Sequence, residues 1–106
     1  MPKYLLKVSY TAEGVKGVLK DGGTARKRAA EAAVKSAGGS LESMYFALGE
    51  DDVFCIFDAP DNVSVAAASM AIGASGLVKA STVVLLTPEE IDQAAKKSVT
   101  YTAPGR

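Results

Sequence analysis

A run of five apolar residues at positions 53–57, Val-Phe-Cys-Ile-Phe, limits the folds open to this chain more than any other feature. Its β-branched and aromatic residues are typical of a strand, and successive side chains of a strand point to opposite faces of a sheet. Both faces of this strand are therefore apolar, and residues 77–86 repeat the pattern. Because strands with one solvated face alternate apolar and polar residues, we predict a sheet that is covered on both faces.

Turn and helix signals divide the rest of the chain into elements. Thr87-Pro88 combines a cap residue with a proline at the first helical position, and Gly38-Gly39 is typical of a helix end. Strands are expected over residues 3–10, 40–48, 53–58 and 77–86, and helices over residues 12–20, 25–37, 63–75 and 88–97. The β-α-β-β-α-β order with a terminal helix predicts a ferredoxin-like α+β fold, with residues 1–106 as one domain.

In this motif both crossover helices lie on one face of a four-stranded antiparallel sheet. After a break at Gly22-Gly23, the second half of the first crossover is expected to begin with Thr24 as its cap. The alanine-rich helix over residues 63–75 is expected to face the sheet through the stripe Val63, Ala66, Ala67, Met70, Ala71 and Ala74. The other face of the sheet stays bare, so we expect a second copy of the chain to cover it, in a homodimer or a higher homo-oligomer.

The composition excludes several classes of function. The chain has no His and a single Cys, Cys55, so it lacks an imidazole base, an internal disulfide and a thiolate zinc cluster. Twelve Lys and Arg balance twelve Asp and Glu, whereas nucleic-acid binding needs a basic excess. No apolar run approaches the ~20 residues of a membrane helix. We expect a soluble cytoplasmic protein with no cofactor, no nucleic-acid partner and no membrane partner, and the free cysteine agrees with a reducing compartment.

Four segments of the chain resemble the GYD domain family. They are YFALGEDDV at 45–53, DAPD at 58–61 with the alanine-rich stretch after it, GGTAR at 22–26 and TPEE at 87–90. The resemblance covers almost the whole chain and implies a dimeric α+β barrel, in which two ferredoxin-like sheets pack face to face. The hairpin turn departs from the family signature, because Gly49 is followed by Asp51-Asp52 where the family carries Tyr-Asp. A role assigned to that tyrosine therefore does not transfer.

No catalytic residue is assigned, and the candidate ligand-binding residues are Lys7, Tyr10, Gly23, Arg26, Tyr45 and Asp52. Gly23, Thr24 and Arg26 could form an anion site, because glycine permits close backbone approach and a helix N-terminus offers free N–H groups. The segment lacks the Lys-Ser/Thr end of a phosphate loop. A helix break followed by a solvated basic turn is the favoured alternative.

Lysines and tyrosines within the predicted strands form a second group of candidates. A charge in a buried strand needs a partner, so Lys7 or Lys79 could bind a ligand carboxylate, and Tyr10 or Tyr45 could donate a hydrogen bond. The alternative is that the lysines extend their amines to water at the sheet edges while the tyrosines fill the core.

The acidic turn Glu50-Asp51-Asp52 and Cys55 carry weaker indications of chemistry. The spacing of the three carboxylates fits no calcium loop, so we predict no metal site and favour a solvated hairpin turn. Asp52 could instead act as an acid or base at the end of a cleft. Cys55 is expected to be a buried neutral thiol, because no His activates it and its neighbours are apolar.

Two hypotheses for function follow. The first is a cofactor-independent enzyme or binder that holds a small organic ligand or anion in a cleft between sheet and helices, by analogy with dimeric α+β barrels. The alternative is a non-catalytic assembly or protein-interaction module. A concave apolar pocket on which Lys7, Tyr45 or Arg26 converge favours the first, and a filled, featureless one favours the second.

Overall fold

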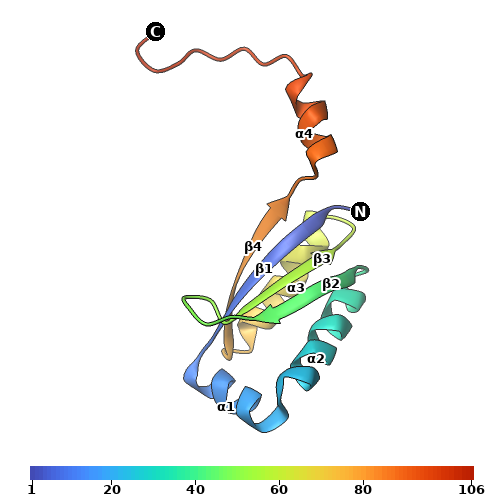
Figure 1. Cartoon of the computed structure of the whole chain (residues 1–106), viewed down its shortest axis with the longest axis vertical. Coiled ribbons are helices and arrows are strands. Elements are labelled where there is room, and N and C mark those ends of the chain that lie inside the picture. The colour runs from blue at the N-terminus through green and yellow to red at the C-terminus, as the bar shows by residue number, and fades with distance from the viewer.

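A four-stranded antiparallel sheet with strand order β2-β3-β1-β4 is the centre of the computed structural model, which describes residues 1–106 (Figure 1). The elements are β1 (Lys3–Tyr10), α1 (Ala12–Asp21), α2 (Gly23–Ser36), β2 (Ser40–Phe46), β3 (Val53–Asp58), α3 (Asn62–Ala74), β4 (Val78–Leu85) and α4 (Pro88–Ala95). This architecture confirms the predicted ferredoxin-like α+β fold. The second strand ends two residues earlier than expected, and so does the last helix.

The cross-strand register decides which residues form the core. Tyr4 of β1 pairs with Phe57 of β3, and Val8 pairs with Val53. These four side chains face α2 and α3 and are buried. The Tyr4 and Phe57 rings stack with their centroids 5.4 Å apart, and the Tyr4 hydroxyl donates to Asn62 Oδ1 at 2.7 Å. The buried phenol therefore keeps a hydrogen bond and ties β1 to the start of α3.

Gly22 divides the first crossover into α1 and α2. Its φ of +82° lies in the left-handed region that favours glycine, and it caps both helices. Thr24 lies within α2 rather than at its cap, so the expected Thr24 cap is wrong: Gly22 redirects the chain before Thr24 is reached. At its other end α1 packs closely on the chain before β4, since a Cβ on Gly14 would lie 2.1 Å from the Leu77 carbonyl oxygen.

α3 turns a different face to the sheet from the one expected. Val65 is buried, while Val63 and Met70 are 79% and 75% exposed. The predicted inner stripe, Val63, Ala66, Ala67, Met70, Ala71 and Ala74, is thus the outer face. The pattern misled because α3 is apolar on nearly all sides and has no amphipathic signal to mark its inner face. None of the helices, α3 included, is long and apolar enough to cross a bilayer.

The second face of the sheet carries no helix of this chain, as the motif predicts (Figure 1). We call it the open face, and its apolar residues are Leu5, Tyr45, Phe54, Ile56, Val83 and Leu85. α4 and the residues after it extend beyond β4, away from the sheet, and the chain is 56 Å along its longest axis. The exposed surface is 7532 Å², whereas a folded monomer of this mass exposes about 5,600 Å².

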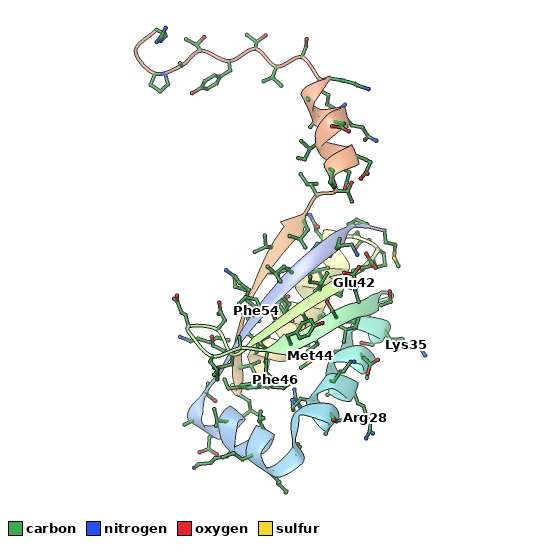
Figure 2. The ribbon with its side chains drawn as sticks, viewed as in Figure 1. Arg28, Lys35, Glu42, Met44, Phe46 and Phe54 are labelled. Carbon is green, nitrogen blue, oxygen red and sulfur yellow. The ribbon has the colours of Figure 1, made fainter.

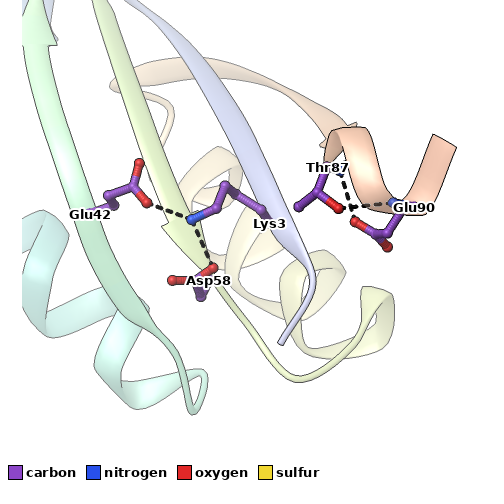
Figure 3. A network of polar contacts seen from close by, with 5 residues as sticks. All are labelled: Lys3, Glu42, Asp58, Thr87 and Glu90. Atoms are coloured by element: carbon purple, nitrogen blue, oxygen red, sulfur yellow. Dashed lines mark hydrogen bonds and ion pairs between the residues drawn. The ribbon is translucent and has the colours of Figure 1, made fainter. Parts of the chain in front are cut away.

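Polar contacts fix the edge of the open face and the start of α4 (Figure 3). The Lys3 amine pairs with Glu42 of β2 and with Asp58 Oδ1 of β3, the latter at 3.1 Å. These hydrogen bonds, first to Glu42 and then to Asp58, raise the pKa of Lys3.

Thr87 Oγ1 accepts from the Glu90 N–H at 3.1 Å, and the Thr87 N–H donates to Glu90 Oε1 at 2.9 Å. This capping box confirms the predicted helix start.

Candidate ligand-binding cleft

An apolar cleft lies between the sheet and the two helices that cover it. Its inner cavity has a volume of about 110 Å³. The lining residues are Leu6, Val8, Tyr10, Arg26, Ala29, Ala30, Ala33, Val34, Met44, Val53, Cys55, Ile72 and Val78. All four strands and both α2 and α3 contribute to this set. Twelve of the thirteen residues are hydrophobic, so the cavity suits an apolar group.

Small side chains on α2 leave this volume unfilled. α2 packs against β2 and α3 packs against β4, so the space over the central strands lies between the two helices. The α2 residues that line it include Ala29, Ala30 and Ala33. Protein interiors are normally close-packed, and larger side chains here would fill the gap. Because alanine is the strongest helix former, the helix remains well formed while the cavity stays open.

Arg26 is the one charged residue that lines the inner cavity. Its Nε is shielded from solvent and has no hydrogen-bond partner, and its side chain takes part in none of the ion pairs of the chain. The neighbouring basic residues Arg28 and Lys35 point away from the sheet (Figure 2). A guanidinium carries a positive charge and offers only hydrogen-bond donors. The cleft therefore presents one positive group with an unused donor.

A second, outer cavity of about 300 Å³ adjoins the inner one on the side of α1. The two cavities share Tyr10, Arg26, Ile72 and Val78. The outer cavity is also lined by Gly14, Gly17, Val18, Asp21, Ser75 and Leu77, and it is more polar. Arg26 thus lies at the junction between an apolar inner space and a polar outer one.

Cys55 lies on the floor of the inner cavity, where it is 3% exposed. Burial raises the pKa of its thiol, because the thiolate would lose its hydration. Cys55 is therefore a neutral thiol, as expected. As the only cysteine of the chain, it is also a natural chemical reporter for this cavity.

The structure brings together only part of the predicted site. Tyr10 and Arg26 line both cavities. Lys7 and Tyr45 belong to the open face of the sheet, because Lys7 pairs with Phe54 and Ser81, and Tyr45 pairs with Phe54. Tyr45 is 72% exposed, so the expectation that it lies in a largely buried strand is wrong for the isolated chain. Strand alternation, with helices on one face only, separates these residues from the cleft.

Gly23 has a packing role next to the cleft. A Cβ at this position would lie 3.3 Å from Cε1 of Phe46, so glycine lets the first turn of α2 approach that ring. Of the three candidate residues for an anion site, Gly23, Thr24 and Arg26, only Arg26 lines the two cavities.

A comparison with protein-family models identifies the family of this chain. The model of the GYD domain matches residues 4–95, which run from β1 to the end of α4. The chain belongs to the GYD domain family. A comparison with curated proteins gave no match. The segments quoted for the resemblance lie, within this GYD domain, in the α1–α2 junction, the β2–β3 hairpin, the start of α3 and the start of α4.

Asp52, the last candidate residue, stabilises the hairpin of the GYD domain. Its Oδ2 accepts the Tyr10 N–H at 2.8 Å, and its own N–H donates to the Val8 carbonyl oxygen at 2.8 Å. Asp51 Oδ1 accepts from Ser9 Oγ at 3.3 Å. No group of three or more Cys, Asp and Glu side chains could hold a metal ion. Asp52 therefore fixes the end of β1 through hydrogen bonds to the backbone of Val8 and Tyr10.

Sequence reasoning missed Met44 and Ile72, both of which line the cleft of this GYD domain. In the sequence nothing distinguishes Met44 from the other residues of its strand. That it faces the cleft follows only from its pairing with Cys55 across β2 and β3. Ile72 lies on the unexpected inner face of α3. The alanines of α2 were the one available signal, because a small-residue helix over a sheet leaves space for a ligand.

Proposed function

We propose that this GYD domain binds a small organic molecule in the cleft between its sheet and helices. The observation that carries the proposal is the apolar inner cavity, which is lined by strands and helices and shares Arg26 with a more polar outer cavity. Ligand sites of this kind combine an apolar lining with a few placed polar groups. Tyr10, Cys55 and Arg26 supply those groups here.

The cavity volume limits the ligand. An apolar cavity of about 150 Å³ in a protein core admits benzene. The inner cavity of about 110 Å³ is slightly smaller, so it takes a short alkyl chain more readily than a bulky ring system. The outer cavity, of about 300 Å³, has room for a polar end of the same molecule.

Alkylation of Cys55 tests this proposal without knowledge of the natural ligand. Hexan-1-ol is a neutral probe of suitable size, and the rate of N-ethylmaleimide addition can be followed by intact mass. Bound hexan-1-ol should slow alkylation several-fold, because the thiol lies on the cavity floor. Ala33→Leu fills the cavity and should remove the protection. Ala32→Leu, on the exposed side of the same helix, is the matched control and should keep it. Equal protection in Ala33→Leu and the parent protein, or none in either, contradicts the proposal.

We also propose that the chain self-associates through the open face of its sheet. Six apolar residues lie there with no cover, and Phe54 and Ile56 give β3 the two-sided character that marks a doubly covered strand. Stable protein interfaces bury roughly 800 Å² or more per partner. We expect two open faces related by a two-fold axis to form an interface of this kind. Sedimentation equilibrium tests this by measuring the mass of the assembly in solution.

A further inference from the structure

We infer that the ligand of this cleft is a monocarboxylate with a short alkyl body, whose carboxylate is bound by Arg26. This inference rests on the proposed function and narrows it to one ligand class. Arg26 lies where the inner and outer cavities meet, so a molecule with its apolar body in the inner cavity has its polar end at the guanidinium.

The unused donor on Arg26 indicates an acceptor in the ligand. Its Nε is out of contact with solvent and unpartnered. Buried polar groups in proteins nearly always have a hydrogen-bond partner. A planar guanidinium matches a planar carboxylate in a two-point contact, and such charge-assisted pairs are among the strongest hydrogen bonds in proteins.

The charges around the cleft favour one negative charge over two. Arg26 is the only cationic residue that lines either cavity, and Asp21 lines the outer one. A phosphate dianion would meet one guanidinium and one opposing carboxylate. A monocarboxylate needs only the guanidinium, and Tyr10, which lines both cavities, carries a further donor.

The inner cavity sets the length of the alkyl body. At about 110 Å³ it is smaller than the cavities that hold an aromatic ring. A chain of about four to six carbons fits this space, which makes hexanoate a suitable probe, with hexan-1-ol as its uncharged counterpart of equal chain length.

Calorimetric titration of hexanoate, hexan-1-ol and inorganic phosphate into the full chain tests the inference. Hexanoate should bind about 10- to 100-fold more tightly than hexan-1-ol, the range expected for hydrogen bonds to a charged group. Arg26→Met keeps the apolar stem and removes the guanidinium, so the ratio of the two affinities should fall to about one. Asp21→Asn removes the opposing carboxylate and should raise the hexanoate affinity by a few-fold.

The outcomes separate this inference from the proposed function. If hexanoate and hexan-1-ol bind the parent protein equally well, the carboxylate assignment is overturned while binding in the cleft stands. If phosphate binds more tightly than hexanoate, the ligand class is wrong. If neither hexanoate nor hexan-1-ol binds, both the carboxylate assignment and the proposed function are wrong. Should Arg26→Met not fold, Arg26→Lys keeps the charge without the planar fork and should weaken hexanoate binding relative to the parent.

Discussion

Replacing Phe54 with lysine should separate self-association from folding. Phe54 lies on the open face of β3 (Figure 2). It pairs with Lys7 of β1 and with Tyr45 of β2. Phe57, three residues further on, lies on the other face and is only 7% exposed in the core. In the proposed dimer a charge at position 54 meets the partner subunit, whereas a charge at position 57 meets the helices of its own chain.

The expected magnitudes follow from these positions. Covering a phenylalanine side chain with a partner contributes about 1.5–3 kcal/mol, and a lysine in its place adds the cost of desolvating an amine. Phe54→Lys should thus weaken the dimer by about 3 kcal/mol or more, which is at least about 100-fold in Kd. Loss of a buried phenylalanine costs about 3–5 kcal/mol of folding stability, out of a usual 5–15 kcal/mol. Phe57→Lys adds a buried charge to that loss and should unfold the chain.

Sedimentation equilibrium and circular dichroism on the same samples measure both effects. The parent protein should sediment as a dimer or larger at micromolar concentration. Phe54→Lys should shift towards a folded monomer of 10.9 kDa, and Phe57→Lys should lose its helical signal. Val63→Lys, at an exposed position on the outer face of α3, is a matched control and should leave the dimer intact. A stable monomer of the parent protein at micromolar concentration, or equal dimerisation of Phe54→Lys and the parent, refutes the reasoning.

Three further predictions concern single side chains. The hydrogen bond from the Ser64 N–H lowers the pKa of Asp61. This helix cap therefore contributes stability above about pH 4, and the contribution is lost as the pH falls through the pKa of Asp61 in the folded protein. In scanning calorimetry, Asp61→Ala should lower the Tm by roughly 3–8 °C at pH 7 and hardly at all in strong acid. Because burial raises the pKa of Cys55, ligand-free protein should react with iodoacetamide more slowly than free cysteine at pH 8, with a rate that keeps rising at higher pH. Calcium and magnesium titrations should show no tight binding that depends on Asp51 or Asp52, because Asp52 already accepts the Tyr10 N–H. Tight binding that is lost in Asp51→Asn and Asp52→Asn would disprove this prediction.

The order of elements was predictable from sequence because glycine, proline and cap residues separate segments with clear strand or helix patterns. Thr87-Pro88 is an example, since its capping box forms as the sequence indicates. The partition of β3 into two apolar faces was predictable as well. Which of them meets the helices was not, because Val53 and Phe54 are equally apolar and only the pairing of β3 with its neighbours decides it.

The cleft was harder to predict than the fold. Arg26 was a candidate both for an anion site on a glycine loop and, with Lys7 and Tyr45, for an apolar pocket, and only Arg26 of these three lines the cleft. Its place follows from the packing of α2 over β2, which local sequence does not encode. The same limit explains why Val63 was expected on the wrong face of α3, because a helix that is apolar all round carries no signal of its orientation.

The methyl resonances of the three methionines test the central claim, binding in the cleft, most directly. Met44 lines the inner cavity, Met70 is on the exposed outer face of α3, and Met1 is exposed at the start of the chain. With protein labelled with ¹³C at the methionine methyl groups, titration with hexanoate should shift the Met44 resonance in a saturable way and leave those of Met1 and Met70 unchanged. A Met44 resonance that does not move at saturating hexanoate, or a shift confined to Met70, contradicts the account.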